Sequence, residues 1–501
     1  MVSSSLTVSR LREGSRRARC WALALALMMG TACTVTDTVA EAVFPLTIMS
    51  PSHGAISGAV SGTAYAYRST VTLTAILPDA SYVVREWTGA AAFCGNASSC
   101  QITMDATKTV GVDIGKVPVG FGSDVTGGLG GTVVTVTTGQ ELETALCGSV
   151  VSGACTDTTP RIVRLSTIID FRTTEGTATS QGCSYSDNGC ALSGATEQTL
   201  NRQTFCSGKT LSTITYDAAG TNPMLVGSNK TIIGIGANAG LKGRGLLLKD
   251  GQSNIIIRNL SISDINEGII WAGDGIAMDN VSRVWIDHDR LARVGRMMIV
   301  TGFGTAANVT ISNNSFDGTT ACGHYCDGRH YWNALFAGAD QTITLIGNWF
   351  HAAAGDAPQL GNPSSGTNGG AVHLVNNYYD NANRLAVVPA SGVLALLEGN
   401  FFADTPGFTP IAPPSGDPVF APLEAAIATA NIDCQAVLGR SCAGNRSTTA
   451  TGNFIMDATV MPAIRATPAY VSAMGSVTPL SAAQVLARVP GAAGPRPDPD
   501  D

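Results

Sequence analysis

Short apolar stretches recur through the middle of the chain, and each ends near an asparagine that an apolar or aromatic pair follows. They read NIIIRNLSI, NVTISNNSF, TITLIGNWF, AVHLVNNYY and VLALLEGNFF. In the last four, Asn314, Asn348, Asn377 and Asn400 follow one another at intervals of 34, 29 and 23 residues. A repeat of this kind, with one supersecondary unit in each period, indicates a solenoid.

Apolar stretches this short, without amphipathic helices between them, favour a parallel β-helix over β–α–β units. We therefore predict an all-β fold, with a right-handed parallel β-helix over residues 118–445. Asparagines at equivalent turns can hydrogen-bond from one coil to the next. The four asparagines are accordingly assigned a structural role.

Residues 45–115 carry a different pattern and are predicted to form a small β-rich unit of their own. Apolar and polar residues alternate in GTAYAYRSTVTLTAIL and again in QITMDATKTVGVDI, on either side of the turn EWTGAAAFCGNASSC. The unit resembles a bacterial β repeat module, and the residues that carry the match are Trp87, Cys94, Cys100, Thr103 and Met104. The resemblance implies a spacer, with polysaccharide binding through exposed aromatic side chains as the alternative.

Residues 1–33 are predicted to be a targeting segment. Five arginines precede the apolar run WALALALMMG, which is too short to span a bilayer and is typical of a signal peptide. The ending GTAC resembles a lipoprotein signal, so either Cys33 is a lipidated first mature residue or ordinary cleavage occurs near Ala32. A linker at residues 34–44 follows. We expect a bacterial protein that is secreted, or anchored by lipid at the cell surface or outer membrane.

Composition and charge narrow the class of protein. Charged residues make up 13% of the chain and aromatic residues 6%, and there are 57 glycines, a balance that favours β-structure with tight turns over helical bundles. The net charge is −7, and loss of the targeting segment, with its five arginines and Glu13, brings it to −11. We therefore expect no nucleic-acid partner.

Eleven cysteines follow the targeting segment, at mostly short spacings that suit local disulfides in an oxidising compartment. Proximity predicts the pairs Cys94–Cys100 and Cys147–Cys155. The cysteines do not show the spacing, with matching histidines, that a zinc site needs, so no metal is expected. An odd number leaves one thiol unpaired, and Cys322 is the candidate.

A group of charged residues interrupts the apolar pattern in VWIDHDRLARVGRMMIV, residues 284–300. Together with the preceding GDGIAMDN, and with CDGRHYW and DFRTTEGTATSQGC elsewhere, this segment is similar to the pectin lyase branch of the pectate lyase superfamily. The similarity covers most of residues 118–442. It implies a monomeric lyase that cleaves the α-1,4-linked galacturonan of pectin without a cofactor. It also implies the disulfides Cys183–Cys206, Cys434–Cys442 and Cys190–Cys326.

The reaction of that family is β-elimination. A base removes the proton on C5, and a cation stabilises the charge that develops on the neighbouring carboxyl oxygens. The resemblance places Asp274 at a cleft aspartate, and Arg296 at the arginine that pectin lyases use where pectate lyases use calcium. The substrate cleft is expected to contain Trp271, Tyr331 and Trp332, for which core packing is the alternative.

Two residues of the charged segment, Asp287 and His288, are assigned to a structural turn. Sixty residues after Arg296, the sequence departs from the family pattern GRxPK. The aligned stretch AGDAPQLG puts Asp356 at the position of the arginine base and Gln359 at that of the lysine. A carboxylate can act as a base, but it repels a developing enolate that arginine would attract. The candidates for the missing cation are Arg384 and Arg329.

Two hypotheses therefore compete. The first is an exported lyase acting on methyl-esterified pectin or a related uronan. The second is a catalytically inactive β-helix that binds acidic polysaccharide at the cell surface. The carboxylate at position 356 favours the second, whereas the intact cleft motifs favour the first, which we prefer.

The end of the chain gives a weaker signal. Residues 446–501 form a C-terminal segment that ends in RVPGAAGPRPDPDD. This ending is rich in Pro, Ala and Asp, and its composition predicts a disordered tail.

Overall fold

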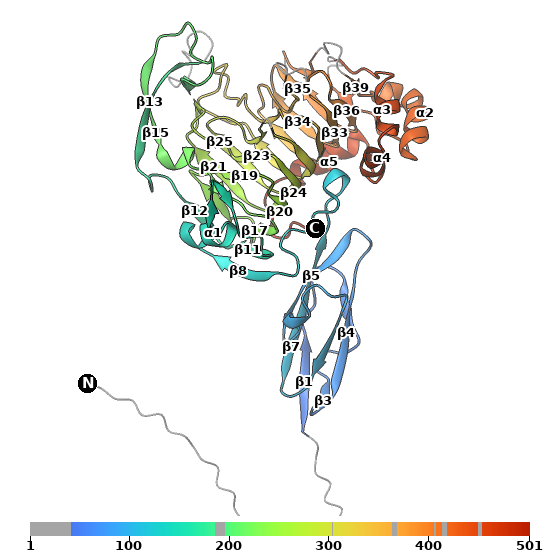
Figure 1. The fold of residues 1–501 in the computed structure, drawn as a ribbon. Coiled ribbons are helices and arrows are strands. Elements are labelled where there is room, and N and C mark those ends of the chain that lie inside the picture. The colour runs from blue at the N-terminus through green and yellow to red at the C-terminus, as the bar shows by residue number, and fades with distance from the viewer. Residues whose placement is uncertain are drawn as a thin grey trace, which may run out of the picture.

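The computed structural model describes residues 42–185, 196–302, 304–362, 368–404, 407–412, 418–448 and 453–500. Figure 1 shows a small β-rich module near the N-terminus and a larger parallel β-helix above it. The predicted targeting segment, with Cys33, lies outside the described residues. Within the described residues, none of the helices has both the length and the apolar character that a membrane span requires.

Three parallel sheets form the walls of the β-helix, as the strand pattern predicted. The first sheet has ten strands: β8 (Thr132–Val136), β11 (Arg161–Leu165), β17 (Lys230–Gly234), β20 (Ser253–Arg258), β24 (Val281–Asp287), β27 (Ala306–Ser312), β30 (Gln341–Ile346), β33 (Gly370–Val375), β36 (Leu394–Glu398) and β39 (Val419–Phe420). The second has nine: β12 (Ile168–Asp170), β18 (Gly240–Lys242), β21 (Ser261–Ile265), β25 (Arg290–Val294), β28 (Ser315–Asp317), β31 (Trp349–His351), β34 (Tyr378–Ala382), β37 (Phe401–Asp404) and β40 (Arg446–Ser447). The third has eight: β16 (Met224–Leu225), β19 (Leu246–Lys249), β23 (Ile276–Asp279), β26 (Ile299–Thr301), β29 (Ala334–Phe336), β32 (Gln359–Leu360), β35 (Leu385–Pro389) and β38 (Thr409–Ile411).

Successive coils pair in register, so equivalent residues stack along the axis of the β-helix. In the first sheet, for example, Ile257, Ile286 and Ile311 are neighbours on three coils, and all three are fully buried. In the second sheet four rings stack with centroids 4.4, 4.8 and 4.6 Å apart, those of Phe316, Phe350, Tyr379 and Phe402. Burial of this continuous apolar interior is the main stabilising contribution to the fold.

The predicted asparagine stack is present. The main-chain N–H groups of Asn314, Asn348 and Asn377 each donate to the side-chain oxygen of the next asparagine, at 3.0, 3.1 and 2.9 Å. Asn400 continues this asparagine ladder to Asn445, at 3.1 Å. The residue before each ladder position has a left-handed backbone, which Asn and Gly tolerate: Asn313 (53°), Gly347 (68°), Asn376 (56°) and Gly399 (64°). This requirement explains the recurring Asn-Asn and Gly-Asn pairs.

The N-terminal module consists of two small sheets. One contains β1 (Val43–Ile48), β3 (Ala64–Ala66), β5 (Tyr82–Gly89) and β7 (Lys108–Lys116), and the other contains β2 (Ala55–Ser57), β4 (Thr70–Ile76) and β6 (Ser99–Thr103). Trp87 is 1% exposed at the centre of the module's core, and its indole N–H donates to the carbonyl of Ala97 at 2.8 Å. The small β-rich unit predicted for residues 45–115 is therefore present.

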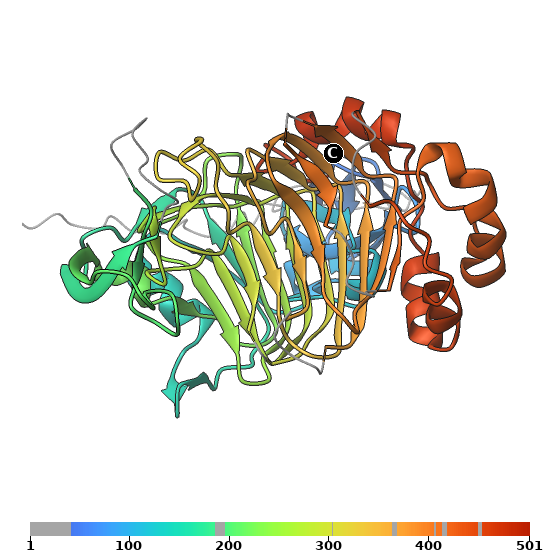
Figure 2. The same cartoon turned by 90° about the horizontal axis from the view of Figure 1, so that it is seen from above.

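In the described part of the chain, five α-helices and a projecting sheet flank the β-helix. Helix α1 (Gly139–Leu146) lies near its first coil, whereas α2 (Ile427–Leu438), α3 (Val460–Arg465) and α4 (Pro468–Gly475) pack together at the other end (Figure 2). Helix α5 (Ala482–Ala492) packs on β34 and β37. Strands β13 (Thr177–Ser184), β14 (Gln198–Leu200) and β15 (Ser212–Asp217) form an antiparallel sheet that joins the β-helix through β22 (Ile269–Ile270). A short hairpin is formed by β9 (Val150–Val151) and β10 (Ala154–Cys155).

Four of the five predicted disulfides are confirmed: Cys94–Cys100, Cys147–Cys155, Cys183–Cys206 and Cys434–Cys442. Cys326 is disulfide-bonded, but Cys190, its predicted partner, lies outside the described residues. Cys322 is a free thiol, as predicted.

The prediction of a disordered C-terminal tail is wrong for the described part of that segment. Residues 496–500 lie between the module and the β-helix, where Asn259 exchanges hydrogen bonds with the main chain of Arg496 at 2.8 and 3.0 Å. Asp500 is only 3% exposed and forms ion pairs with Arg85 of the module and Arg258 of the β-helix. A polar composition predicts disorder only where the charged side chains of the segment have no partners. Here the carboxylate of Asp500 has two.

Candidate active site

Equivalent positions on successive coils bring several predicted site residues into one column beside the third sheet. Strands β26, β29, β32 and β35 pair in that order, and main-chain hydrogen bonds near the starts of these strands join Met298 to Trp332, Ala334 to Asp356 and Ala357 to Ala386. Arg296, Trp332, Asp356 and Arg384 therefore lie on four consecutive coils. Because neighbouring strands are about 4.8 Å apart, Arg296 and Asp356 are separated by about 10 Å along the axis.

Arg296 is held in a fixed orientation. Its Nε and Nη2 donate to the two carboxylate oxygens of Asp274, at 2.9 and 2.8 Å, and the main-chain N–H of Met297 donates to the same carboxylate at 2.9 Å. The guanidinium carbon lies 4.0 Å from the centroid of the Trp271 ring. Its Nη1 donates to no described residue, so one edge of the guanidinium is left for a ligand oxygen.

Arg296 and Trp271 line a cavity of about 280 Å³. Phe205, Trp332 and Gln359 line it too, with the apolar side chains of Met297, Val300, Leu335 and Ala337. The indole N–H of Trp271 is buried and has no hydrogen-bond partner among the described residues. An aromatic and apolar lining with a few polar groups is typical of a small-molecule or sugar-binding site.

A cluster of aromatic side chains surrounds this cavity. Tyr185 stacks on Phe205 with centroids 5.1 Å apart, Phe205 meets Trp271 edge to face at 5.4 Å, and Tyr331 meets Trp332 at 4.8 Å. Behind it, the carboxylate of Glu197, whose residue is 1% exposed, accepts hydrogen bonds from the Trp332 indole at 3.1 Å and His324 Nδ1 at 3.0 Å. This carboxylate fixes the orientation of two rings of the cluster.

Asp356 is buried beside Tyr331. The residue is 3% exposed, burial raises the pKa of its carboxyl group to about 7, and no other described residue donates a hydrogen bond to that carboxyl group. The pKa of Tyr331 is also raised, first by burial and then by the charge of Asp356, so the two groups are close. The Tyr331 ring lies against Gly355, where an added Cβ would stand 2.3 Å from a ring carbon.

The two candidates for a further cation differ in their surroundings. Arg329 donates to the main-chain and side-chain oxygens of Asn381, at 2.5 and 2.6 Å, and is 3.5 Å from the carboxylate of Asp327, so it ties one loop to the next coil. Arg384 is exposed, and its guanidinium lies 4.1 Å from the centroid of the Tyr325 ring. Only Arg384 therefore keeps its charge available near the column.

The charged segment at residues 284–300 is mostly structural. Asp287 is 1% exposed and accepts hydrogen bonds from Arg258, Ser312 and Asn313, at 2.7, 2.6 and 3.0 Å. Burial alone would raise the pKa of Asp287, but His288 and Arg258 outweigh it and hold that pKa below its usual range. Of this segment, Arg296, Met297 and Val300 line the cavity.

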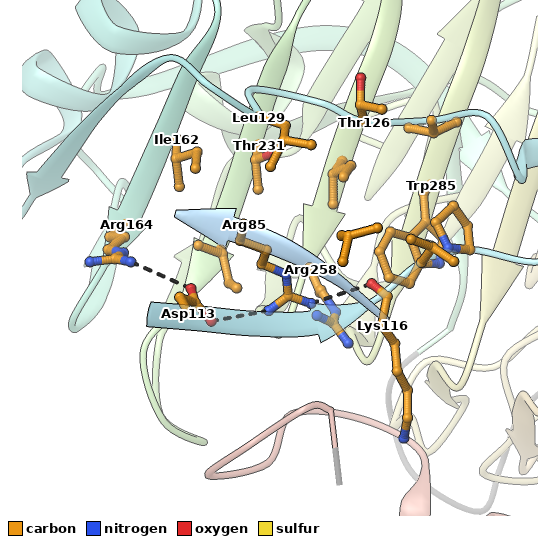
Figure 3. A pocket seen from close by; sticks show the side chains of 16 residues that line it. Arg85, Asp113, Lys116, Thr126, Leu129, Ile162, Arg164, Thr231, Arg258 and Trp285 are labelled. Atoms are coloured by element: carbon orange, nitrogen blue, oxygen red, sulfur yellow. Dashed lines mark hydrogen bonds and ion pairs between the residues drawn. The ribbon is translucent and has the colours of Figure 1, made fainter. Parts of the chain in front are cut away.

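Charged side chains also gather at two other places. A cavity of about 100 Å³ between the module and the first sheet has an apolar lining, and its charged residues, among them Arg85, Asp113 and Arg164, are paired with one another or with neighbours (Figure 3). In the described part of the chain, one group of metal-ligand type occurs, His53, Asp498 and Asp500, but Asp500 is already bound by two arginines. Because the charged groups at these two places are already paired, we assign the candidate active site to the column.

Comparisons with known proteins identify the family of this chain. The family description "Pectate lyase" matches residues 145–493, and "Divergent InlB B-repeat domain" matches residues 44–112. The chain belongs to the pectate lyase family. It is 36% identical to probable pectin lyase E of Aspergillus fumigatus over 66% of this chain and 82% of that protein. It is 37% identical to probable pectin lyase F-2 of Aspergillus terreus over 74% of this chain and 75% of that protein.

Among solved structures, a pectate lyase from Acidovorax avenae subsp citrulli is similar to this chain. Its TM-score is 0.45, with 18% identity over 76% of this chain and 95% of that one. The pectate lyase match of this chain continues past the boundary predicted at residue 445 and includes α5. Membership of this family supports a polysaccharide lyase function, and the roles assigned to individual residues stay predictions.

The structure brings Asp274, Arg296, Trp271 and Trp332 together at the cavity and places Tyr331, Asp356 and Arg384 beside them. Sequence reasoning missed Phe205, Tyr185 and Glu197, which lie in the segments next to the strands of the projecting sheet. Their segment contains no periodic apolar pattern. The disulfide between Cys183 and Cys206, which holds Tyr185 and Phe205 close together, was the one signal available.

Proposed function

We propose that this member of the pectate lyase family is an exported polysaccharide lyase that cleaves methyl-esterified galacturonan by β-elimination. One observation carries the proposal. The guanidinium of Arg296, fixed by Asp274 and open on one edge, lines an aromatic cavity two coils from a buried carboxyl group whose pKa is near 7. The printed names of the relatives, pectin lyases, support the choice of pectin.

Each group has a role in this reaction. Arg296 donates to the ester carbonyl oxygen next to C5, and its charge stabilises the enolate that forms there. Asp356 is proposed as the base that takes the C5 proton. The electron pair left on C5 forms the C4–C5 double bond as the bond from C4 to the leaving oxygen breaks, and that oxygen takes a proton from water to become a hydroxyl group. Because the carboxylate becomes neutral as it accepts the proton, its repulsion of the enolate disappears as that charge develops.

Burial suits Asp356 to this role. An ordinary carboxylate, with a pKa of about 4, is a weak base at neutral pH, whereas a base whose pKa lies near the working pH combines ionisation with proton affinity. The apolar and aromatic cavity is also expected to accept methyl esters more readily than free uronates. We therefore expect esterified pectin to be a better substrate than polygalacturonate.

The proposal is tested by incubating the purified protein with methyl-esterified pectin and recording ultraviolet absorbance. β-Elimination leaves a C4–C5 double bond conjugated with the carboxyl group, so absorbance is expected to rise with time. Arg296→Lys keeps the charge but loses the planar fork, and its initial rate is expected to fall at least about 10-fold. If the wild-type protein forms no unsaturated product on any uronan, the lyase proposal fails.

Calcium is expected to be unnecessary. Arg296 already occupies the carboxylate of Asp274, and its charge repels a second cation at that place. Excess chelator is therefore expected to leave the initial rate unchanged. Loss of activity on chelation, with recovery on addition of calcium, would contradict the assignment of the cation role to Arg296.

A second candidate function is binding of acidic polysaccharide without cleavage, which the carboxylate at position 356 favours. Asp356→Arg distinguishes the two. If the wild type is an inactive binder whose cleft is otherwise competent, this variant gains lyase activity, because a cation again stabilises the enolate. If Asp356 is the base, the same substitution abolishes the activity of the wild type. An unchanged urea midpoint is the check that the variant folds.

A further inference from the structure

A row of rings at the rim of the aromatic cluster carries a cation at each end. Tyr185, His324 and Tyr325 follow one another with centroids 5.2 and 4.6 Å apart. The ammonium of Lys209 lies 4.5 Å from the Tyr185 centroid, and the guanidinium of Arg384 lies 4.1 Å from the Tyr325 centroid. We call these five side chains the rim row.

The two cations of the rim row have no carboxylate partner among the described residues. Lys209 donates only a long hydrogen bond, 3.4 Å, to the carbonyl of Ser184, and the guanidinium of Arg384 has no ion pair there. Both side chains are exposed. By contrast, arginines elsewhere on the β-helix are paired at short distances, as Arg290 is with Asp317 and Arg293 with Asp264. Within the described residues, Lys209 and Arg384 therefore differ from these paired arginines.

The position of the rim row connects it to the reaction site. Tyr185 contacts Phe205 and Trp332, which line the cavity, and Tyr325 lies 6.0 Å from Tyr331. Arg384 follows Asp356 by one coil, on the side opposite to Arg296. A polysaccharide chain that passes through the reaction site thus has one cation of the rim row within reach on each side of the central rings.

We propose that the rim row binds the free carboxylates of a partially methyl-esterified uronan, while the aromatic cavity accepts the esterified sugar to be cleaved. This inference rests on the proposed lyase function and deepens it. A methyl ester cannot form an ion pair, whereas a uronate can pair with a cation that an aromatic face already holds in place. In a chain with a net charge of −7, these cations also draw a polyanion towards the cleft.

The test compares Lys209→Gln, Arg384→Gln and the double variant with the wild type on fully esterified pectin, on partially esterified pectin and on polygalacturonate. Each single substitution is expected to raise KM on partially esterified pectin about five-fold, because an exposed ion pair contributes modestly. KM on fully esterified pectin is expected to stay the same. Arg488→Gln, which removes an exposed cation from α5, is the matched control and should change neither KM.

Two further readouts make the outcome decisive. On partially esterified pectin, the difference in KM between the wild type and the variants is expected to shrink when salt is raised from about 0.05 to 0.5 M. These values are chosen so that the screening length falls several-fold. Titration calorimetry with a short galacturonate oligomer measures binding without turnover. If the variants bind the oligomer as the wild type does, or lose affinity equally for fully esterified pectin, the inference is overturned. If no protein makes unsaturated product but the variants lose affinity for the oligomer, the lyase function fails and the carboxylate site stands.

Discussion

At the scale of single residues, Asp356 combines a chemical role with a cost in stability. Burial raises the pKa of its carboxyl group to about 7, whereas an aspartate in an unfolded chain has a pKa of about 3.9. Between about pH 4 and 7 the folded protein therefore binds one more proton at this site than the unfolded chain does. The stability that this group contributes is present below about pH 4 and is lost as the pH rises to 7.

Asp356→Asn is expected to lower activity and raise stability. As the base, Asp356 must be ionised, so wild-type kcat/KM should rise with pH to a plateau, with an apparent pKa near 7. Loss of the base should lower kcat by about 100-fold or more. The same variant should unfold at a higher urea concentration than the wild type at pH 8, and at a similar concentration at pH 4. A variant with unchanged kcat would show that another group removes the proton.

Gly355 is predicted to be required because the Tyr331 ring lies directly on it. An added Cβ would stand 2.3 Å from a ring carbon, so Gly355→Ala must push the ring away from the column. A displacement of about 1 Å near reacting atoms can cost up to about 100-fold in rate, which initial rates of product formation would measure. Gly491→Ala is the control, since nothing lies within 4 Å of the added Cβ there. Equal rates for both variants would mean that Tyr331 does not position the substrate.

Sequence reasoning identified Asp356 and Tyr331 as site residues but did not predict their surroundings. Alignment of AGDAPQLG placed Asp356 at the base position, and the strand register confirms that Asp356 lies in the column with Arg296. The raised pKa of Asp356 depends on burial by Tyr331 and the neighbouring coils, which no local pattern encodes. For the same reason Arg329 and Arg384 were equivalent candidates in the sequence, and only the contacts of Arg329 with Asn381 separate them.

At the scale of structural elements, the asparagine ladder was predictable because its members repeat beside apolar strands. Its two ends were not predicted. Asn445 follows Asn400 in the ladder but is separated from it in the sequence by α2. On the coil before Asn314 the ladder position is Asp289, whose carboxyl group lacks the NH₂ group of asparagine. The main-chain N–H of Asp289 donates to the side-chain oxygen of Asn314 at 2.8 Å, as a ladder residue does.

The carboxyl group of Asp289 fits the ladder only in part. Its Oδ1 accepts from the N–H of Leu260 at 2.7 Å, whereas its Oδ2 is buried without a partner among the described residues. In the other ladder residues that second position is an NH₂ group, which donates to a main-chain carbonyl and to the next asparagine, as in Asn314. Burial accordingly raises the pKa of Asp289 well above its usual value.

Asp289→Asn is therefore predicted to stabilise the β-helix. The new NH₂ group can donate where the carboxyl oxygen could not, and we expect a gain of about 1–2 kcal/mol in the free energy of unfolding near pH 7. The gain should be larger at pH 8 than at pH 4, because wild-type Asp289 is penalised when it is ionised. Urea unfolding measures both values. Asn348→Asp, the reverse change in the middle of the ladder, should destabilise the protein, and a stable Asn348→Asp variant would contradict this account.

At the scale of the whole molecule, the module is joined to the β-helix by the C-terminal tail. Asp500 accepts hydrogen bonds from Arg85 of the module at 2.6 and 2.8 Å, and from Arg258 of the β-helix at 2.8 Å. It also accepts one from the main-chain N–H of Lys116, at 2.8 Å, where the module ends. The composition of the tail concealed this arrangement, because its partners lie about 240 and 415 residues away in the sequence.

The charges in this contact depend on one another. Burial alone would raise the pKa of Asp500, but Arg258 and Arg85 outweigh it and hold that pKa below its usual range. The contribution of Asp500 to stability is therefore present at neutral pH and is lost as the pH falls through that lowered pKa. A buried ion pair is weak evidence of net stabilisation, whereas removal of one partner leaves the other charge uncompensated at a cost of about 3–5 kcal/mol.

Asp500→Asn is accordingly predicted to loosen the module without impairing the reaction site, which lies beside the third sheet. Arg85 would lose its closest carboxylate, and trypsin should cleave after Lys116 more than about 10-fold faster than in the wild type, since local opening controls cleavage. The initial rate on pectin should stay the same. Asp498→Asn is the control on the same tail. Asp498 is partly exposed, and its carboxylate faces His53, at 3.3 Å, instead of two arginines. If cleavage of Asp500→Asn matched that of the wild type, other contacts, such as the 2.5 Å pair between Arg164 and Glu86, would have to hold the module in place.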